Sequence, residues 1–94
     1  MKYFTWDAGK NEILKRERNI SFEEVIFHIE KGELLDIIEH PNKKKYANQQ
    51  IIIVAMNNYA YLIPFIETGH EVILKTIIPS RKATKTYLGG KTNA

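Results

Sequence analysis

The chain has 94 residues, a formal net charge of +3 and no cysteine, and 44% of its residues are hydrophobic. This length suits one domain with a modest core, and the apolar fraction argues against a disordered chain. The lack of cysteine excludes disulfides and thiolate sites, and no apolar run approaches membrane-spanning length. Because the N-terminus shows no signal-peptide pattern, we expect a cytoplasmic protein.

A strand followed by a helix is predicted at the N-terminus. The segment Lys2–Trp6 is short and rich in aromatic residues, which favours a strand. Asp7 is suited to cap a helix over Ala8–Arg18, because its carboxylate can accept an N–H of the first turn. Asn19 then suits the left-handed conformation that ends many helices.

A second helix follows almost at once. Ser21 and Glu24 form a capping box, in which each side chain reaches the backbone of the other residue. The predicted helix runs from Phe22 to about Lys31, and Gly32 ends it. Its apolar residues recur at helical spacing and should form one buried stripe: Phe22, Val25, Ile26 and Ile29.

The rest of the chain predicts strands joined by polar turns, over Leu34–Glu39, Gln50–Met56, Tyr59–Ile66 and Glu71–Ile78. Asn57–Asn58 suits a two-residue hairpin turn, because asparagine tolerates positive φ. Pro64 removes a backbone donor, so we expect an edge or a bulge there. Pro79 should end the last strand, and a short helix can follow from Ser80.

These elements predict an α+β fold in the order β-α-α-β-β-β-β. Two helices are expected to pack on one face of a mostly antiparallel sheet. We expect a single domain over residues 1–88, followed by a flexible C-terminal tail over residues 89–94.

The charges are segregated along the chain. Six acids and one lysine lie between Phe22 and His40, whereas Lys75–Ala94 contains five cations and no acid. A further basic run, Lys43–Lys45, lies in the polar loop His40–Asn48. Phosphate is the commonest partner of an acid-free basic surface, which favours binding of a nucleic acid. The alternative interpretation is a solvated, frayed tail.

Three segments together resemble the BrnT family of bacterial toxins from type II toxin–antitoxin systems. They are Phe4-Thr5-Trp6-Asp7 with Lys10-Asn11, then Ile20-Ser21-Phe22-Glu23-Glu24-Val25, and finally Ile77-Ile78-Pro79-Ser80-Arg81-Lys82-Ala83-Thr84. The resemblance covers roughly residues 3–87. It implies a RelE-like ribonuclease fold and a metal-independent RNA endonuclease that inhibits translation. It also implies a small ribbon-helix-helix-like antitoxin as partner, with no metal and no cofactor.

Cleavage of RNA without a metal needs a base, a cation beside the phosphate and an acid. Arg81 and Lys82 suit the cation, since a guanidinium grips two phosphate oxygens at once. Lys75 can bind phosphate from the last strand or act as base, and His40 is the histidine best placed for proton transfer. Further RNA contacts are expected from Lys43, Lys44, Lys45, Lys85 and Tyr87.

A second interpretation stays open, namely an RNA- or partner-binding module without catalysis. Where the family carries a histidine and two arginines, this chain has Glu17-Arg18-Asn19, Gln49-Gln50 and Thr76. Only Arg81 and Lys82 correspond directly to the family's basic residues. The structural alternative for each candidate is an ordinary solvated cation or a packed aromatic ring.

Overall fold

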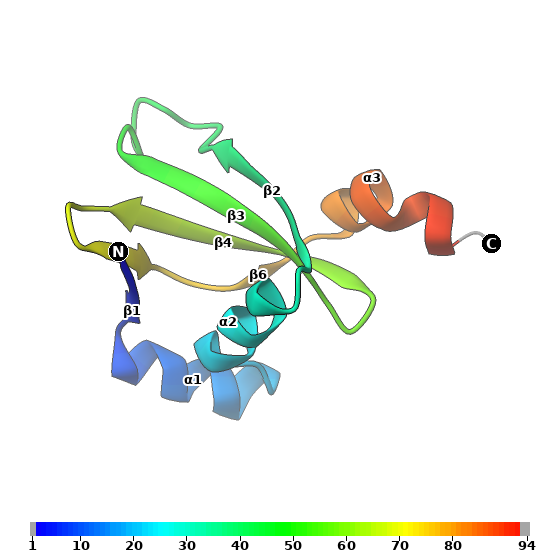
Figure 1. The fold of residues 1–94 in the computed structure, drawn as a ribbon, viewed down its shortest axis with the longest axis horizontal. Coiled ribbons are helices and arrows are strands. Elements are labelled where there is room, and N and C mark those ends of the chain that lie inside the picture. The colour runs from blue at the N-terminus through cyan, green and yellow to red at the C-terminus, as the bar shows by residue number, and fades with distance from the viewer. Residues whose placement is uncertain (1, 93–94) are drawn as a thin grey trace.

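A computed structural model of the chain describes residues 2–92, and the side chains of residues 2–89. Three helices and six strands follow one another in this part of the chain (Figure 1): β1 Tyr3–Trp6, α1 Ala8–Arg18, α2 Phe22–Glu30, β2 Leu34–Glu39, β3 Gln49–Met56, β4 Tyr59–Glu67, β5 Glu71–Leu74, β6 Ile78–Pro79 and α3 Arg81–Thr92. The predicted α+β class is therefore confirmed. No helix in residues 2–92 is long and apolar enough to cross a membrane.

The sheet is mixed, with the strand order β1-β5-β4-β3-β2 and β6 as an extra partner of β4. Strand β1 runs parallel to β5. The other pairs are antiparallel: β2 with β3, β3 with β4, and β4 with both β5 and β6. The N-terminal strand thus pairs with a strand almost 70 residues later, from Tyr3 opposite Glu71 to Trp6 opposite Leu74.

Local capping fixes where α1 and α2 begin. The Asp7 side chain accepts the Lys10 N–H at 2.8 Å, and Asn19, at φ 56°, ends α1 in the left-handed conformation. The Ser21 Oγ accepts the Glu24 N–H at 3.2 Å at the start of α2. These caps satisfy backbone groups that the helices leave unpaired, as the sequence predicts.

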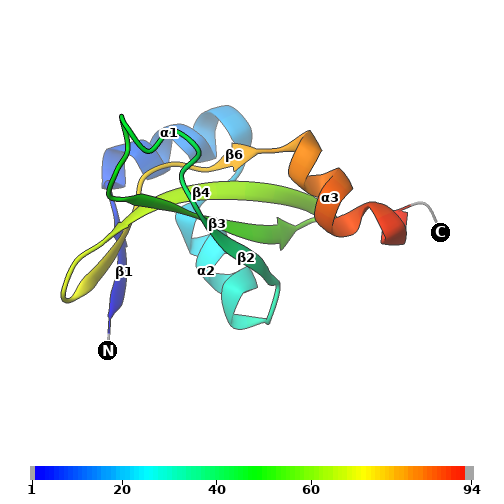
Figure 2. The same cartoon turned by 90° about the horizontal axis from the view of Figure 1, so that it is seen from above.

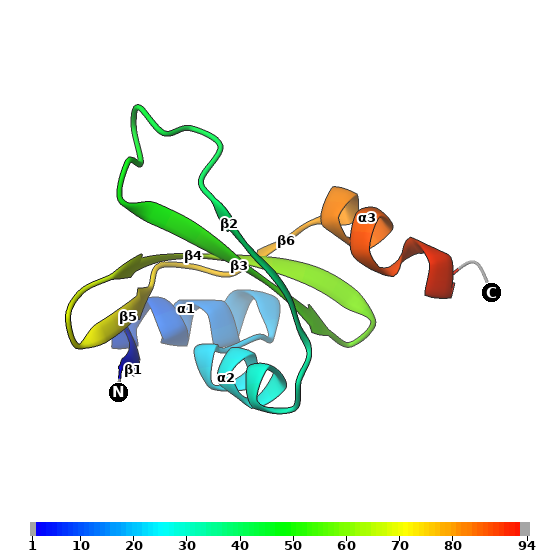
Figure 3. The ribbon, with the colours of Figure 1, turned by 45° about the horizontal axis from the view of Figure 1, so that its top comes forward.

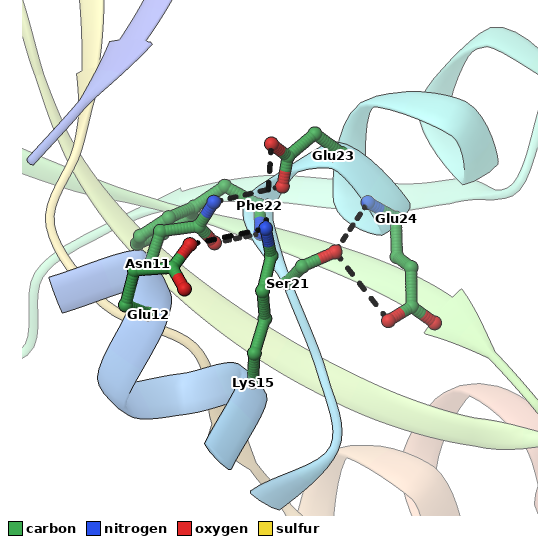
Figure 4. Close-up of polar contacts among 7 residues, drawn as sticks. All are labelled: Asn11, Glu12, Lys15, Ser21, Phe22, Glu23 and Glu24. Carbon is green, nitrogen blue, oxygen red and sulfur yellow. Dashed lines mark hydrogen bonds and ion pairs between the residues drawn. The ribbon is translucent and has the colours of Figure 1, made fainter. Parts of the chain in front are cut away.

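A buried asparagine joins the two helices (Figure 4). Asn11 is only 3% exposed; its Oδ1 accepts the Phe22 N–H at 2.8 Å and its Nδ2 donates to Glu23 at 2.8 Å. The Lys15 Nζ lies 3.3 Å from Oε2 of Glu12 and 3.9 Å from Oε2 of Glu23. The polar groups of this joint therefore have hydrogen-bond partners, which offset the free-energy cost of removing them from water.

The sheet has a core on each face. The larger core lies beneath α1 and α2 and contains Leu14, Ile20, Phe22, Val25, Ile52, Val54, Met56, Ile63, Phe65, Leu74 and Ile77. The smaller core lies beneath α3 and contains Ile51, Ile53, Ala60, Ala83 and Leu88. Figure 3 shows α1 and α2 below the sheet and α3 above it, and in Figure 2 α3 projects from one end.

The helix expected after Ser80 is present as α3, but it is longer than expected and packs on the second face of the sheet, which corrects the prediction of helices on one face alone. The expected tail 89–94 begins inside α3, which continues to Thr92, while residues 93–94 lie outside the described residues. Side chains alternate between the two faces in β4, since Tyr61 faces the larger core and Ala60 and Leu62 face the smaller one.

The predicted strand Glu71–Ile78 is divided into β5 and β6, and Pro64 gives the physical reason. Pro64 is buried in the central strand β4, not at an edge, and its pairing with Ile51 of β3 is regular. On the other side of β4 the register shifts by one residue, from Phe65 opposite Leu74 to Leu62 opposite Ile78, so the expected irregularity lies there. Its carbonyl accepts the Lys75 N–H at 2.8 Å. Because proline has no N–H, Pro64 cannot donate a hydrogen bond back to this segment, and the pairing with β4 is interrupted between β5 and β6.

Candidate nucleic-acid interface

The start of α3 is held rigidly against β4. The Ser80 N–H donates to the Ala60 carbonyl at 3.0 Å, and the Ala60 N–H donates to Thr84 Oγ1 at 2.8 Å. The Thr84 hydroxyl in turn donates to the Ser80 carbonyl at 2.7 Å. Ser80 Oγ accepts the Ala83 N–H at 3.0 Å and so caps the helix. The first turn of α3 is therefore fixed to the sheet by both backbone and side chains.

Three cations lie on the solvent side of this anchored turn: Arg81, Lys82 and Lys85, which we call the α3 basic surface. All three are exposed, whereas Ala83 and Leu88 are each 8% exposed and pack on the sheet. The N-terminal end of a helix carries a partial positive charge, which adds to the charge of these side chains. The surface therefore attracts anions from a defined direction.

Unlike several other cations of the protein, the three cations of the α3 basic surface have no acidic partner among the described side chains. Glutamates lie at ion-pair distance from Lys2, Lys15, Lys31 and Lys43. Among the described side chains, no acid lies within ion-pair distance of Arg81, Lys82 or Lys85. These three charges are therefore free to bind a phosphate without breaking an internal contact.

Lys75 lies apart from the α3 basic surface, although it is exposed. The Lys75 N–H donates to the Pro64 carbonyl, and the Ser80 N–H donates to the Ala60 carbonyl. Pro64 and Ala60 are four residues apart on β4. At the usual rise of a strand, this separates the two backbone positions by about 13 Å. The two sites can contact different phosphates of one strand, but they do not form one cluster.

The loop between β2 and β3 is internally ordered and contains His40. The His40 ring lies 4.3 Å from the Tyr46 ring, and its Nδ1 accepts the Asn42 N–H at 3.1 Å. Because Nδ1 is an acceptor here, the neutral ring carries its proton on Nε2. In this tautomer Nε2 can donate a hydrogen bond, while Nδ1 is already occupied by the Asn42 N–H.

The three lysines of this loop differ in their contacts. Lys43 forms an ion pair with Glu39 at 3.0 Å, and Lys45 Nζ lies 5.4 Å from the centre of the Tyr46 ring. Lys44 is exposed and has no acid at ion-pair distance among the described side chains. The loop therefore offers fewer free charges than its sequence indicates.

The loop and α3 lie at opposite ends of the sheet (Figure 1). The loop leads into Gln49 of β3, whereas α3 begins beside Ala60, which is paired with Ala55. Six residues of strand correspond to about 20 Å. The structure therefore does not bring His40 or Lys43–Lys45 to the α3 basic surface.

Tyr87 lies on α3 but its phenol is already bonded within the protein. Its O–H donates to Asp36 Oδ2 of β2 at 2.7 Å. This hydrogen bond to a carboxylate raises the pKa of Tyr87 above its ordinary value. The contact joins residues 51 positions apart, and sequence reasoning missed Asp36 because no local pattern marks such a partner.

The arrangement can bind phosphate, and its proton-transfer groups are dispersed. Arg81 and Lys82 can stabilise a charged phosphorane. No histidine lies in contact with them among the described residues, and no group of three or more histidines, aspartates or glutamates in this part is arranged to hold a metal ion. The side chain of Lys91, the last cation of the basic segment, lies outside the described residues.

Comparisons of the chain with protein-family models, with curated proteins and with solved structures gave no match.

Proposed function

We propose that this protein binds RNA through the α3 basic surface and acts as the toxin of a type II toxin–antitoxin system. The observation that carries the proposal is a group of three exposed cations, without acidic partners, on a helix start bonded to β4. Rigid positioning of such charges favours contact with successive phosphates of one nucleic-acid strand. The resemblance of the sequence to BrnT toxins supports RNA as the substrate and a small antitoxin protein as the partner.

In this proposal the protein cleaves RNA without a metal. A general base takes the proton of the RNA 2′-hydroxyl, the 2′-oxygen attacks the phosphorus, and the bond to the 5′-oxygen breaks. The products are a 2′,3′-cyclic phosphate and a 5′-hydroxyl, whose proton comes from a general acid. Arg81 is assigned to stabilise the phosphorane, and Lys82 binds beside it. Lys75 can contact a neighbouring phosphate, while Lys85 holds the RNA backbone.

The second candidate is an RNA-binding module without catalysis. Two observations favour it: His40 lies at the far end of the sheet, and the Tyr87 phenol donates to Asp36. A protein of this kind would bind RNA through the same three cations and leave it intact. Binding and cleavage must therefore be measured separately.

Purified protein should be incubated with single-stranded RNA in the presence of a metal chelator, beside the variants Arg81→Gln and Arg16→Gln. Arg16 is a matched control, because it is an exposed arginine of α1 with no acid at ion-pair distance among the side chains of residues 2–89. We expect fragments ending in 2′,3′-cyclic phosphate, with a rate roughly 10²-fold lower in Arg81→Gln and unchanged in Arg16→Gln.

Two outcomes would change this conclusion. RNA that is bound but stays intact would support the non-catalytic module in place of the endonuclease. RNA that is neither bound nor cleaved would contradict both functions.

Expression of the wild-type chain is also expected to arrest bacterial growth, whereas expression of a folded Arg81→Gln variant is not.

A further inference from the structure

Strand β2 forms one edge of the sheet and exposes apolar side chains there. It is the last strand in the order β1-β5-β4-β3-β2. Leu34 and Ile37 on it are 40% and 48% exposed. An edge strand offers unpaired backbone groups, and proteins usually protect such edges with charges or bulges. β2 has charged residues and a register shift between Leu34 and Asp36, yet Leu34 and Ile37 remain exposed.

One backbone donor of this edge is held only by a neighbouring side chain. The Ile37 N–H donates to Asp36 Oδ1 at 2.8 Å, in an exposed contact between adjacent residues. It therefore does not take part in the ladder between β2 and β3. A carbonyl from an added strand could take this N–H, since the Asp36 carboxylate can be solvated in exchange.

A shallow apolar hollow opens next to Ile37. It has a volume of about 230 Å³ and lies on the sheet face that α1 and α2 cover only in part. Its apolar lining comes from all five principal strands: Phe4, Ile37, Ile52, Phe65 and Val72. A side chain from a strand added beside β2 would stand next to Ile37, and could extend into this hollow.

The charge of the edge indicates what kind of strand fits. Residues 32–42 contain three acids, Glu33, Asp36 and Glu39, and neither lysine nor arginine. Lys31 and His28 lie near Glu33, and Lys43 pairs with Glu39, but no cation lies at ion-pair distance from Asp36 among the described side chains. A second copy of β2 would bring like charges together, which is destabilising. A basic strand would be complementary.

We infer that the β2 edge binds a short extended segment of a partner protein, in which lysine or arginine alternates with apolar residues. The segment adds to the sheet as a sixth principal strand. Its carbonyl accepts the Ile37 N–H, its apolar side chains lie on Ile37 and the hollow, and its cations lie on the opposite face near Asp36. This surface is separate from the α3 basic surface, so the inference does not rest on the proposed RNA binding.

Two synthetic peptides of ten residues test the inference with the full chain, one alternating lysine with valine and the other alternating glutamate with valine. Their affinities and the hydrogen exchange of the Ile37 amide are measured by NMR titration. We expect the basic peptide alone to bind and to slow exchange at Ile37. Ile37→Pro, which removes the edge donor and spares the ladder to β3, should weaken binding roughly tenfold, whereas Ile37→Val should not.

A second variant keeps the test independent of how proline is tolerated. Asp36→Asn removes the charge and keeps one oxygen for the Ile37 N–H, but it loses the acceptor of the Tyr87 O–H. It should weaken the basic peptide and reduce its salt dependence, whereas Tyr87→Phe, which removes only the bond to Asp36, should do neither. The inference is overturned if neither peptide binds, if both bind equally, or if exchange slows at β1 and not at β2. Self-association of the chain through β2 would also overturn it, because the occupant would then be a second copy.

Discussion

The two faces of the sheet use charged side chains in opposite ways. On the face of α1 and α2, Lys15 lies between Glu12 and Glu23, and the buried Asn11 ties Glu23 to the start of α2. On the face of α3, Arg81 and Lys82 are exposed and have no acidic partner among the described side chains. The comparison indicates that ion pairs and a buried amide join α1 to α2, whereas Arg81 and Lys82 of α3 form no ion pair with the rest of the described chain.

The largest expected effect is the loss of Phe22 from the larger core. Phe22 is completely buried and stacks on Trp6, with 5.6 Å between the ring centres. Phe22→Ala should lower the free energy of unfolding by about 3–5 kcal/mol, because it removes transfer energy and leaves a cavity. Urea denaturation followed by circular dichroism measures this. A loss below about 1 kcal/mol would show that this face does not dominate stability.

On the other face, Leu88→Ala should have a smaller and more local effect. Leu88 is 8% exposed and belongs to the smaller core beneath α3. We expect a loss near 2 kcal/mol, at the low end for such truncations, and faster hydrogen exchange in α3 than in β3. Equal acceleration in α3 and β3 would mean that the two cores unfold as one unit.

Local chemistry allowed much of the first face to be predicted from the sequence. Asp7, Ser21 and Asn19 act within a few residues of their own positions, and α1 begins and ends where the sequence predicts. The division of the last strand was not predictable, because it depends on Pro64 lying opposite Lys75 in the folded sheet.

The candidate site was predicted less well, for the same physical reason. Exposure of Arg81 and Lys82 follows from an acid-free basic segment. The separation of His40 from them depends on which end of β3 each loop occupies, and that is set by strand pairing. The bond between Tyr87 and Asp36 likewise joins elements that are distant in the sequence.

The joint between α1 and α2 should be weakened by Asn11→Ala. This change removes the acceptor of the Phe22 N–H and the donor to Glu23 in a site that is almost fully buried. A buried N–H without a partner costs about 1–3 kcal/mol, and we expect a loss of that size. Asn48→Ala, at an exposed position of the loop before β3 without positive φ, provides a comparison outside the joint and should leave the stability unchanged. An Asn11→Ala protein as stable as the wild type would contradict the role of the joint.

The smallest expected effect is the pH dependence contributed by Glu23. The hydrogen bond from Asn11, aided by a backbone amide and Lys15, lowers the pKa of Glu23 below its ordinary value of 4.5. A carboxyl group with a lowered pKa stabilises the fold above its ordinary pKa, and this contribution disappears as pH falls through the folded value. Glu23→Gln should therefore melt about a few degrees lower than wild type at pH 7. The gap should close below pH 4.5, and a gap that is independent of pH would exclude this cause.

The central claim is that the α3 basic surface binds the RNA backbone, and the salt dependence of RNA affinity tests it most directly. Fluorescence anisotropy with single-stranded RNA should be compared for wild type, Arg81→Gln/Lys82→Gln/Lys85→Gln and the α1 control Lys10→Gln/Arg16→Gln/Arg18→Gln. Removing three phosphate contacts should reduce the slope of log affinity against log salt by about 2. We predict this reduction for the α3 variant alone. An unchanged slope in the α3 variant, or an equal reduction in the α1 control, would contradict the account.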